Sequence, residues 1–145
     1  MRKNISAAIA VFLLAACGGK EASAPPPAPA QAVQGALAPA GDRIGLPDGG
    51  WFTWGFAEKP KLGTAIMKVQ VYDKAGTRAT PYEVIGEYGM PSMRYHDSGP
   101  VKFQLNRKGD YLLPVNIVMA GEWEVLIRLI EGKEKIYEGK VLFTI

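Results

Sequence analysis

Hydrophobic and polar residues alternate in several stretches of the chain after residue 50. In one of them, Met67, Val69 and Val71 alternate with Lys68 and Gln70. Because successive side chains of a β-strand point to opposite faces, this period of two predicts strands that bury one face. None of these stretches has the spacing of an amphipathic helix. The alternation recurs, between turn signals, in residues 82–88, 101–105, 111–119, 123–129 and 141–145.

Together with an aromatic segment over residues 51–56, these stretches predict about seven short strands at roughly ten-residue spacing. That number and spacing are typical of an all-β, immunoglobulin-like antiparallel β-sandwich. We expect residues 51–56 to cover the core from an edge strand, with an exposed aromatic patch for a partner as the alternative. Pro114 lies inside the longest stripe and has no N–H to donate, so we expect it at a sheet edge or a bulge.

The first sixteen residues have the composition of an export signal. Arg2 and Lys3 precede an apolar run over residues 5–16, which is too short to span a bilayer as a helix. Small residues then lead to Cys17, the only cysteine. This arrangement resembles the lipobox of bacterial lipoproteins, in which the cysteine is acylated and becomes the first mature residue. An ordinary secretory signal with an unused thiol is the alternative.

The predicted lipid anchor sets the compartment and the domain layout. Gly18 follows the cysteine, and by the same resemblance this favours the outer membrane over the inner, with the protein facing the periplasm. We expect residues 1–16 to be the signal peptide and 17–43 to be the acylated cysteine and a disordered linker. The linker is rich in Ala and Pro and has few large apolar groups. Residues 44–145 then form one domain.

Charge and cysteine content exclude some classes of protein. Without Arg2 and Lys3, 15 of the 17 basic residues remain, against 14 acidic ones. A nearly neutral chain with no basic block is not expected to bind nucleic acid. If Cys17 carries the anchor, no cysteine is left for a disulfide, so the hydrophobic core alone must stabilise the domain.

The residues with the most specific chemistry are Met90, Met93 and His96. Thioether sulfur is a soft ligand, and together with imidazole it favours Cu(I) over Zn²⁺ or hard cations. Positions 90 and 93 of a strand would face opposite sides, so a shared site requires a turn over residues 91–92. Met119 lies at a predicted strand end and is a candidate for a fourth ligand at the same end of the sandwich.

A structural interpretation of these residues stays open. Methionine commonly fills irregular gaps in a core, so Met90 and Met93 are also explained as packing residues, with His96 in a solvated turn. The pattern is short, and its spacing alone does not separate the two interpretations.

Several segments after residue 63 resemble the YtkA-like and FixH-like families of exported domains. The matching segments are 69–73, 90–96, 109–111 and 119–125. The resemblance implies an immunoglobulin-like sandwich, a role in copper handling, and a link to the assembly of copper-containing terminal oxidases. It matches Met90, Met93 and His96 to the Met and His segment of these families. Other matched positions read as scaffold, namely Gly109, Tyr111, Gly121 and Trp123.

Two functions therefore remain open from the sequence. One is a lipid-anchored, periplasm-facing domain that binds or passes Cu(I); the other is a metal-free protein-interaction or envelope-assembly module. We do not expect an enzyme. Ser92, Asp97 and Ser98 share one loop with His96, whereas the members of a nucleophilic triad usually come from separate elements. The chain also lacks a phosphate-binding loop and a catalytic zinc pattern.

Overall fold

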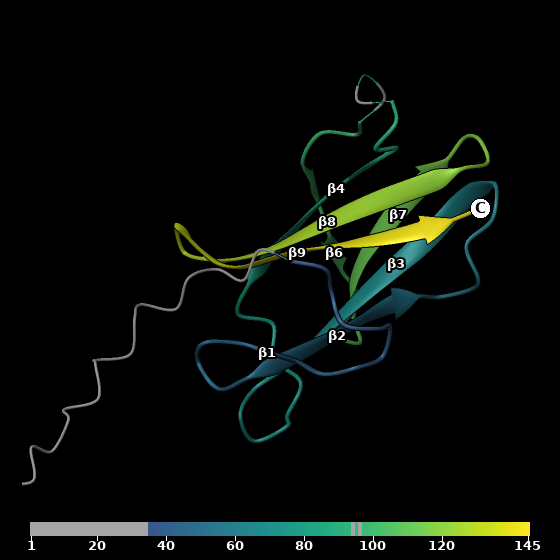
Figure 1. Cartoon of the computed structure of the whole chain (residues 1–145). Helices are drawn as coiled ribbons and strands as arrows, with labels where there is room; N and C mark the ends of the chain where they lie inside the picture. Colours follow the sequence, from purple (N-terminus) through teal and green to yellow (C-terminus); the bar gives the residue numbers. More distant parts are fainter. Residues whose placement is uncertain (1–34, 94, 96) are drawn as a thin grey trace, which may run out of the picture.

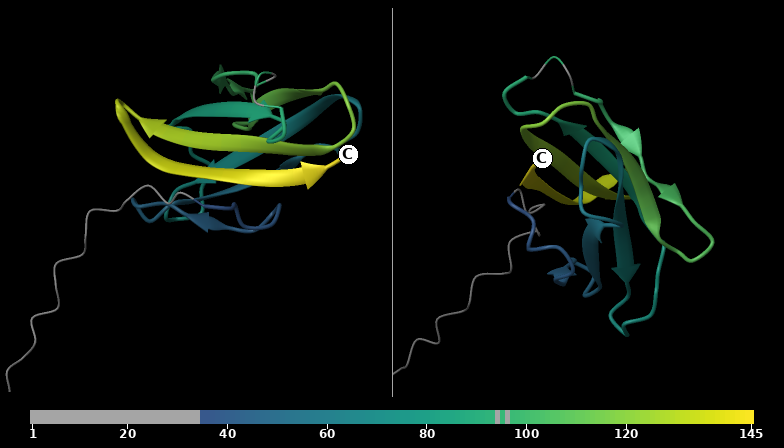
Figure 2. Two further views of the ribbon diagram at one scale, coloured as in Figure 1. Left: turned by 45° about the horizontal axis from the view of Figure 1, so that its top comes forward. Right: turned by 90° about the vertical axis from the view of Figure 1, so that its right-hand side faces the viewer.

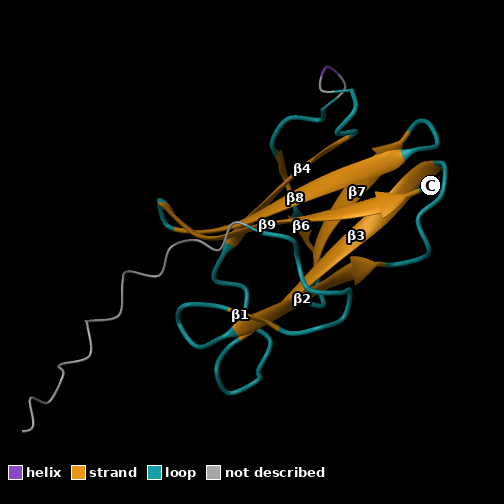
Figure 3. Ribbon diagram, viewed as in Figure 1, coloured by secondary structure: helices purple, strands orange, loops and turns teal. Residues whose placement is uncertain are grey.

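Two antiparallel β-sheets packed face to face make up the domain (Figures 1 and 2). The computed structural model describes residues 35–93, 95 and 97–145. Strands dominate this part of the chain, and none of it forms a helix long and apolar enough to cross a bilayer (Figure 3). The predicted all-β, immunoglobulin-like sandwich is thus confirmed. Its strands are β1 Ile44–Gly45, β2 Trp51–Phe56, β3 Gly63–Tyr72, β4 Glu83–Gly89, β5 Val101–Lys102, β6 Gln104–Leu105, β7 Tyr111–Ile117, β8 Glu122–Glu131 and β9 Glu134–Thr144.

The larger sheet has the order β1-β2-β3-β7-β6, and the smaller one has the order β5-β4-β8-β9. The chain changes sheets between β5 and β6, at Phe103, which is only 3% exposed. The single strand predicted over residues 101–105 is therefore wrong, because these residues contribute two short strands to different sheets. Leu105, expected on the buried face, is 51% exposed because β6 lies at the edge of the larger sheet.

Alternating positions of the long strands fill the space between the sheets. In β3, for example, Met67 and Val69 are fully buried and their neighbours in sequence are half-buried. Phe52 and Trp54 of β2 also join this core. The two-residue strand β1 pairs only with residues 51–52, so the rest of β2 forms the edge of the larger sheet, as expected. Burying a large apolar side chain stabilises a fold by about 1.5–3 kcal/mol, so these stripes supply the main driving force for folding.

Pro114 occupies the kind of position that its missing N–H requires. It pairs with Ile66 of β3 on one side. On the other side of β7, β6 pairs only with residues 111–112, so the strand is an open edge at Pro114. The sequence-based expectation of an edge position is confirmed.

The folded unit begins before the predicted boundary at residue 44. Ala36 forms a parallel bridge to Lys140 of β9, and Leu37 is 9% exposed. The Leu37 N–H donates to the carbonyl of Lys140 at 2.8 Å, and the Lys140 N–H donates to the carbonyl of Gly35 at 3.0 Å. Residues 35–43, assigned to the linker by composition, therefore pack against the domain. The rest of the predicted linker, the signal peptide and Cys17 lie outside the described residues.

Candidate metal centre at the methionine end

The two ends of the sandwich differ in chemistry. We call the end formed by loops 57–62, 90–100 and 118–121 the methionine end, and the end formed by loops 46–50, 73–82 and 106–110 the carboxylate end. The strands β3, β4 and β7 each run from one end to the other. Three of the four predicted metal ligands, Met90, Met93 and Met119, lie in described loops at the methionine end. His96 lies outside the described residues.

Met90 and Met93 are linked by a tight turn directly after β4. The N–H of Met93 donates to the carbonyl of Met90 at 2.8 Å, and residues 91–92 form the turn that the sequence requires for a shared site. The two side chains differ in exposure: Met90 is 6% exposed and Met93 is 37% exposed. One thioether is thus held inside the protein and the other is open to solvent.

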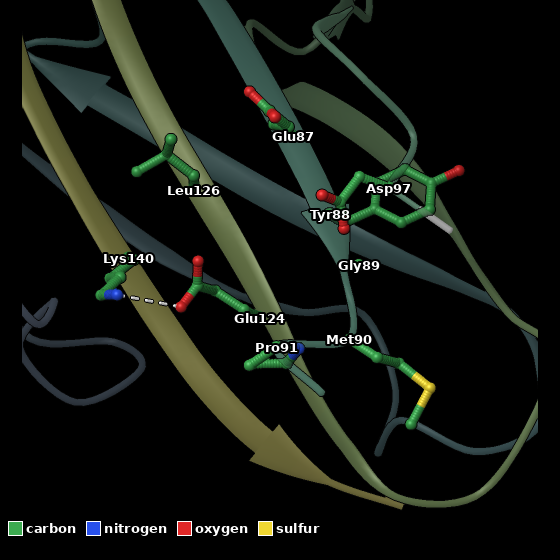
Figure 4. Close-up of a pocket in the computed structure, with 9 residues that line it drawn as sticks. All are labelled: Glu87, Tyr88, Gly89, Met90, Pro91, Asp97, Glu124, Leu126 and Lys140. Atoms are coloured by element: carbon green, nitrogen blue, oxygen red, sulfur yellow. Dashed lines mark hydrogen bonds and ion pairs between the residues drawn. The ribbon is translucent and has the colours of Figure 1, made fainter. Parts of the chain in front are cut away.

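Met90 reaches the loop that contains Met119. A Cβ atom placed on Gly121 would lie 2.6 Å from Cε of Met90, so the methyl group of Met90 packs directly against the backbone of that glycine. Figure 4 shows the Met90 side chain directed toward the loop that joins β7 and β8. Met119 is two residues before Gly121 in this loop and is 37% exposed. The fold therefore brings thioether-bearing loops from distant parts of the sequence together at one end.

The loop over residues 118–121 is held by hydrogen bonds on both sides. The indole Nε1–H of Trp123, a residue only 3% exposed, donates to the carbonyl of Met119 at 3.0 Å. Gly121 and Ile145 exchange two backbone hydrogen bonds, of 3.2 and 3.0 Å. The φ angle of Gly121 is +140°, which disfavours any other residue at this position.

A depression of about 310 Å³ lies beside Met90 on the outer side of the smaller sheet (Figure 4). Its lining includes the carboxylates of Glu87, Asp97 and Glu124, and Glu124 is paired with Lys140 at 3.0 Å. Among the described residues, no group of three His, Cys, Asp or Glu side chains is arranged to hold a metal ion. The candidate ligands at this end are the methionine thioethers predicted from the sequence.

The arrangement favours a soft, monovalent ion. A thioether has no proton to lose, so its availability as a ligand does not depend on pH, unlike that of thiol or imidazole. The burial of Met90 keeps water away from one candidate ligand, while Met93 and Met119 stay accessible from outside. Such a site can accept an ion from solvent or from another protein.

The four residues matched to scaffold positions occupy turns and core. Gly109 has a φ of +77° in the turn before β7. Tyr111 is 3% exposed, and its hydroxyl donates to the carbonyl of Tyr82 at 2.8 Å. Sequence reasoning missed the direct contact of Gly121 with Met90 and the bonds of Ile145. No local pattern in the sequence signals the contact of Gly121 with Met90, because it joins two loops that are far apart in the chain.

Comparisons with known proteins reveal only distant likeness. No family model and no curated protein matches the chain. A copper-bound variant of FetP from uropathogenic Escherichia coli strain F11 is similar in structure, with 10% identity, a TM-score of 0.49, and coverage of 73% of this chain and 95% of that chain. A copper-bound variant of Campylobacter jejuni P19 has 12% identity, a TM-score of 0.49, and coverage of 74% and 96%. At this distance, the copper in those structures identifies no ligand in this chain.

Proposed function

We propose that this domain binds Cu(I) at its methionine end and passes it on within the cell envelope. Met90 and Met119 are the central ligands, and Met93 and His96 complete the site from the loop after β4. The observation that carries the proposal is the packing of the Met90 methyl group against Gly121, which places the buried thioether beside the loop of Met119. Methionine thioethers with an imidazole select Cu(I) by softness rather than by charge.

The role is binding and transfer rather than catalysis. The proposed ligands are soft, and two of them are exposed, which suits reversible uptake and release of an ion. In this proposal Cys17 carries the acyl chains, and residues 18–34 tether the domain to the membrane, the outer one in preference to the inner. The resemblance to FixH-like domains adds a role in supplying copper during assembly of an oxidase.

A competition titration tests the proposal. Residues 18–145, which retain the whole described domain, are titrated with Cu(I) against a chromophoric chelator under anaerobic, reducing conditions, as wild type and as Met90→Leu. We expect sub-micromolar affinity in the wild type and a clear loss in Met90→Leu. Met67→Leu is the matched control, because Met67 is a fully buried core methionine of β3 that takes no part in the proposed site. Equal affinity in all three proteins would refute the proposal.

A metal-free interaction module is the second candidate, and the exposed apolar residues at the methionine end favour it. Leu62 and Val118 are 57% and 63% exposed, and they flank the paired residues Gly63 and Ile117 of β3 and β7. Tyr95, in the loop after β4, is 99% exposed. Apolar side chains from three loops at one end are typical of a surface that contacts another protein. A folded wild-type domain that binds no Cu(I) would leave this candidate as the better explanation.

A further inference from the structure

We propose that Gly121 and Trp123 are positioning residues, which hold Met90 and Met119 in place for metal binding before the metal arrives. This inference rests on the proposed Cu(I) function and explains how the site is organised. Neither residue offers a ligand atom to the metal: Gly121 has no side chain, and the indole of Trp123 is a donor only. Their influence therefore has to pass through the two methionines.

Gly121 positions Met90 by leaving space for it. A Cβ on Gly121 would lie 2.6 Å from Cε of Met90, closer than real Cβ contacts. Among the described residues, and apart from its chain neighbours, no other atom lies within 4 Å of that position. A larger residue would therefore have to displace the end of the Met90 side chain. The methyl group can move in two ways: by a shift of the whole thioether, or by rotation about the Cγ–Sδ bond with the sulfur in place. Either movement changes the direction of the sulfur lone pairs through which the thioether would bind an ion.

Trp123 positions Met119 through the backbone. Its indole N–H donates to the Met119 carbonyl at 3.0 Å, and its ring is buried in the core. The two bonds between Gly121 and Ile145 tie the same loop to the end of β9. The loop that carries Met119 is thus connected to two strands of the smaller sheet, which limits the orientations available to the Met119 side chain.

A site organised in this way binds metal more tightly because less ordering is needed on binding. Residues that orient metal ligands from the second layer usually change affinity by about 10-fold to 100-fold when they are replaced. We therefore expect Gly121→Ala and Trp123→Phe each to weaken Cu(I) binding by at least about tenfold, although every proposed ligand remains present.

Each variant has a matched control elsewhere in the sandwich. Gly76, in loop 73–82 of the carboxylate end, also has a positive φ, of +81°, but a Cβ there would meet none of the described residues within 4 Å, so Gly76→Ala places an alanine at a positive φ without a collision. Trp54 is 7% exposed, and its indole donates to the carbonyl of Ala38 at 2.8 Å. Trp54→Phe thus removes an equivalent buried hydrogen bond from a region outside the methionine end.

The experiment has two readouts, of which only the second needs copper. First, ¹³C-methyl NMR spectra of the metal-free proteins report the environment of each methionine methyl group. We expect the Met90 signal to move in Gly121→Ala and the Met119 signal to move in Trp123→Phe, with both near their wild-type positions in the controls. Second, the competition titration gives the Cu(I) affinity of all five proteins.

The outcomes separate this inference from the proposed function. Moved methyl signals with affinity reduced in Gly121→Ala and Trp123→Phe, but not in the controls, support the positioning role. If the wild type binds Cu(I) and the two variants bind it equally well, the inference fails while the proposed function stands. Unmoved methyl signals also overturn the inference. A wild type that binds no Cu(I) removes the proposed function, and the positioning role with it.

Discussion

The carboxylate end and the methionine end of the sandwich differ in the chemistry of their side chains. At the carboxylate end, Asp110 is almost buried and accepts hydrogen bonds from Gln70 at 2.8 Å and from Asn106 at 3.2 Å, and it pairs with Arg78. At the methionine end, the groups that stand out are thioethers and exposed apolar side chains. Directional, charged contacts stabilise the fold at the carboxylate end, whereas the methionine end presents polarisable side chains, which are the candidate ligands.

The electrostatics of the carboxylate end support this division. Burial works against the charged form of Asp110, but hydrogen bonds from Gln70, Arg78 and Asn106 outweigh it and lower the pKa of this carboxyl to about 2. Asp48 accepts a short hydrogen bond from the Tyr82 hydroxyl, which lowers the pKa of Asp48, and burial together with that bond raises the pKa of Tyr82. Both carboxylates are therefore tied into the folded structure by their hydrogen bonds.

The largest expected effect is on stability, from Asp110→Ala. This change leaves the partly buried guanidinium of Arg78 and the amide of Gln70 without their partner. We expect the free energy of unfolding to fall by about 3 kcal/mol, because an unpaired buried donor or charge keeps its desolvation cost. Urea denaturation measures this loss. Cu(I) affinity of the folded fraction should stay at the wild-type level, and a parallel loss of affinity would contradict the separation of the two ends.

The double variant Met90→Leu, Met119→Leu should lose Cu(I) affinity and keep its stability, the opposite of Asp110→Ala. With two of the proposed ligands removed, we expect Cu(I) affinity to fall by about a hundredfold or more, which corresponds to about 2.7 kcal/mol. Exchange of methionine for leucine conserves volume and usually changes stability by less than about 1.5 kcal/mol. Titration and urea denaturation on the same protein check both values. If this variant lost stability but kept its Cu(I) affinity, the two methionines would be packing residues rather than ligands.

Acid should weaken the domain through its carboxylate end. The pKa of Asp110 is about 2 in the folded protein, against 3.8 for the unperturbed group, so the unfolded state takes up the proton first as the pH falls. The stabilisation is therefore complete above about pH 4 and is lost between about pH 4 and pH 2, with a contribution of about 2 kcal/mol. Thermal unfolding across this range measures it. Asp110→Asn lacks this titration, so its stability should fall less steeply over the same range.

The smallest effect should come from an exposed ion pair outside both ends. Lys102 contacts Glu83 at 2.8 Å, but its side chain is 66% exposed. Solvent screening reduces the value of such pairs to less than about 1 kcal/mol. Lys102→Ala is thus expected to change the free energy of unfolding by no more than about 0.5 kcal/mol. A change comparable to that of Asp110→Ala would show that surface charge, rather than the buried cluster, governs stability.

The sequence predicted the features that depend on local pattern. The period of two identified the long strands, and the missing N–H of Pro114 indicated an open edge. The turn between Met90 and Met93 followed from spacing and from Pro91. Local pattern did not reveal the change of sheets at Phe103. Apolar and polar residues alternate without a break through residues 101–105, but the strand ends at Lys102 and a new one begins at Gln104 in the other sheet.

The features that the sequence did not predict arise from contacts between distant residues. Residues 35–43 were assigned to a linker because the predicted linker is rich in Ala and Pro. Composition could not show that Leu37 packs against Gly139. The approach of Met90 to Gly121 likewise depends on how two loops meet in space, and no period or motif encodes it. For the candidate site, the sequence predicted the residue types, and the structure shows that three of the four residues lie in loops at one end of the sandwich.

The parallel bridge at Ala36 has a mechanical consequence. If Cys17 is anchored in a membrane, a pull on the domain passes first through the two hydrogen bonds that join Gly35 and Leu37 to Lys140. A short segment paired at one point of an edge strand separates before the longer pairing of β8 with β9, which covers ten residue pairs. Tension on the tether would thus lengthen it by a few residues and leave the two sheets, and the site between their loops, undisturbed.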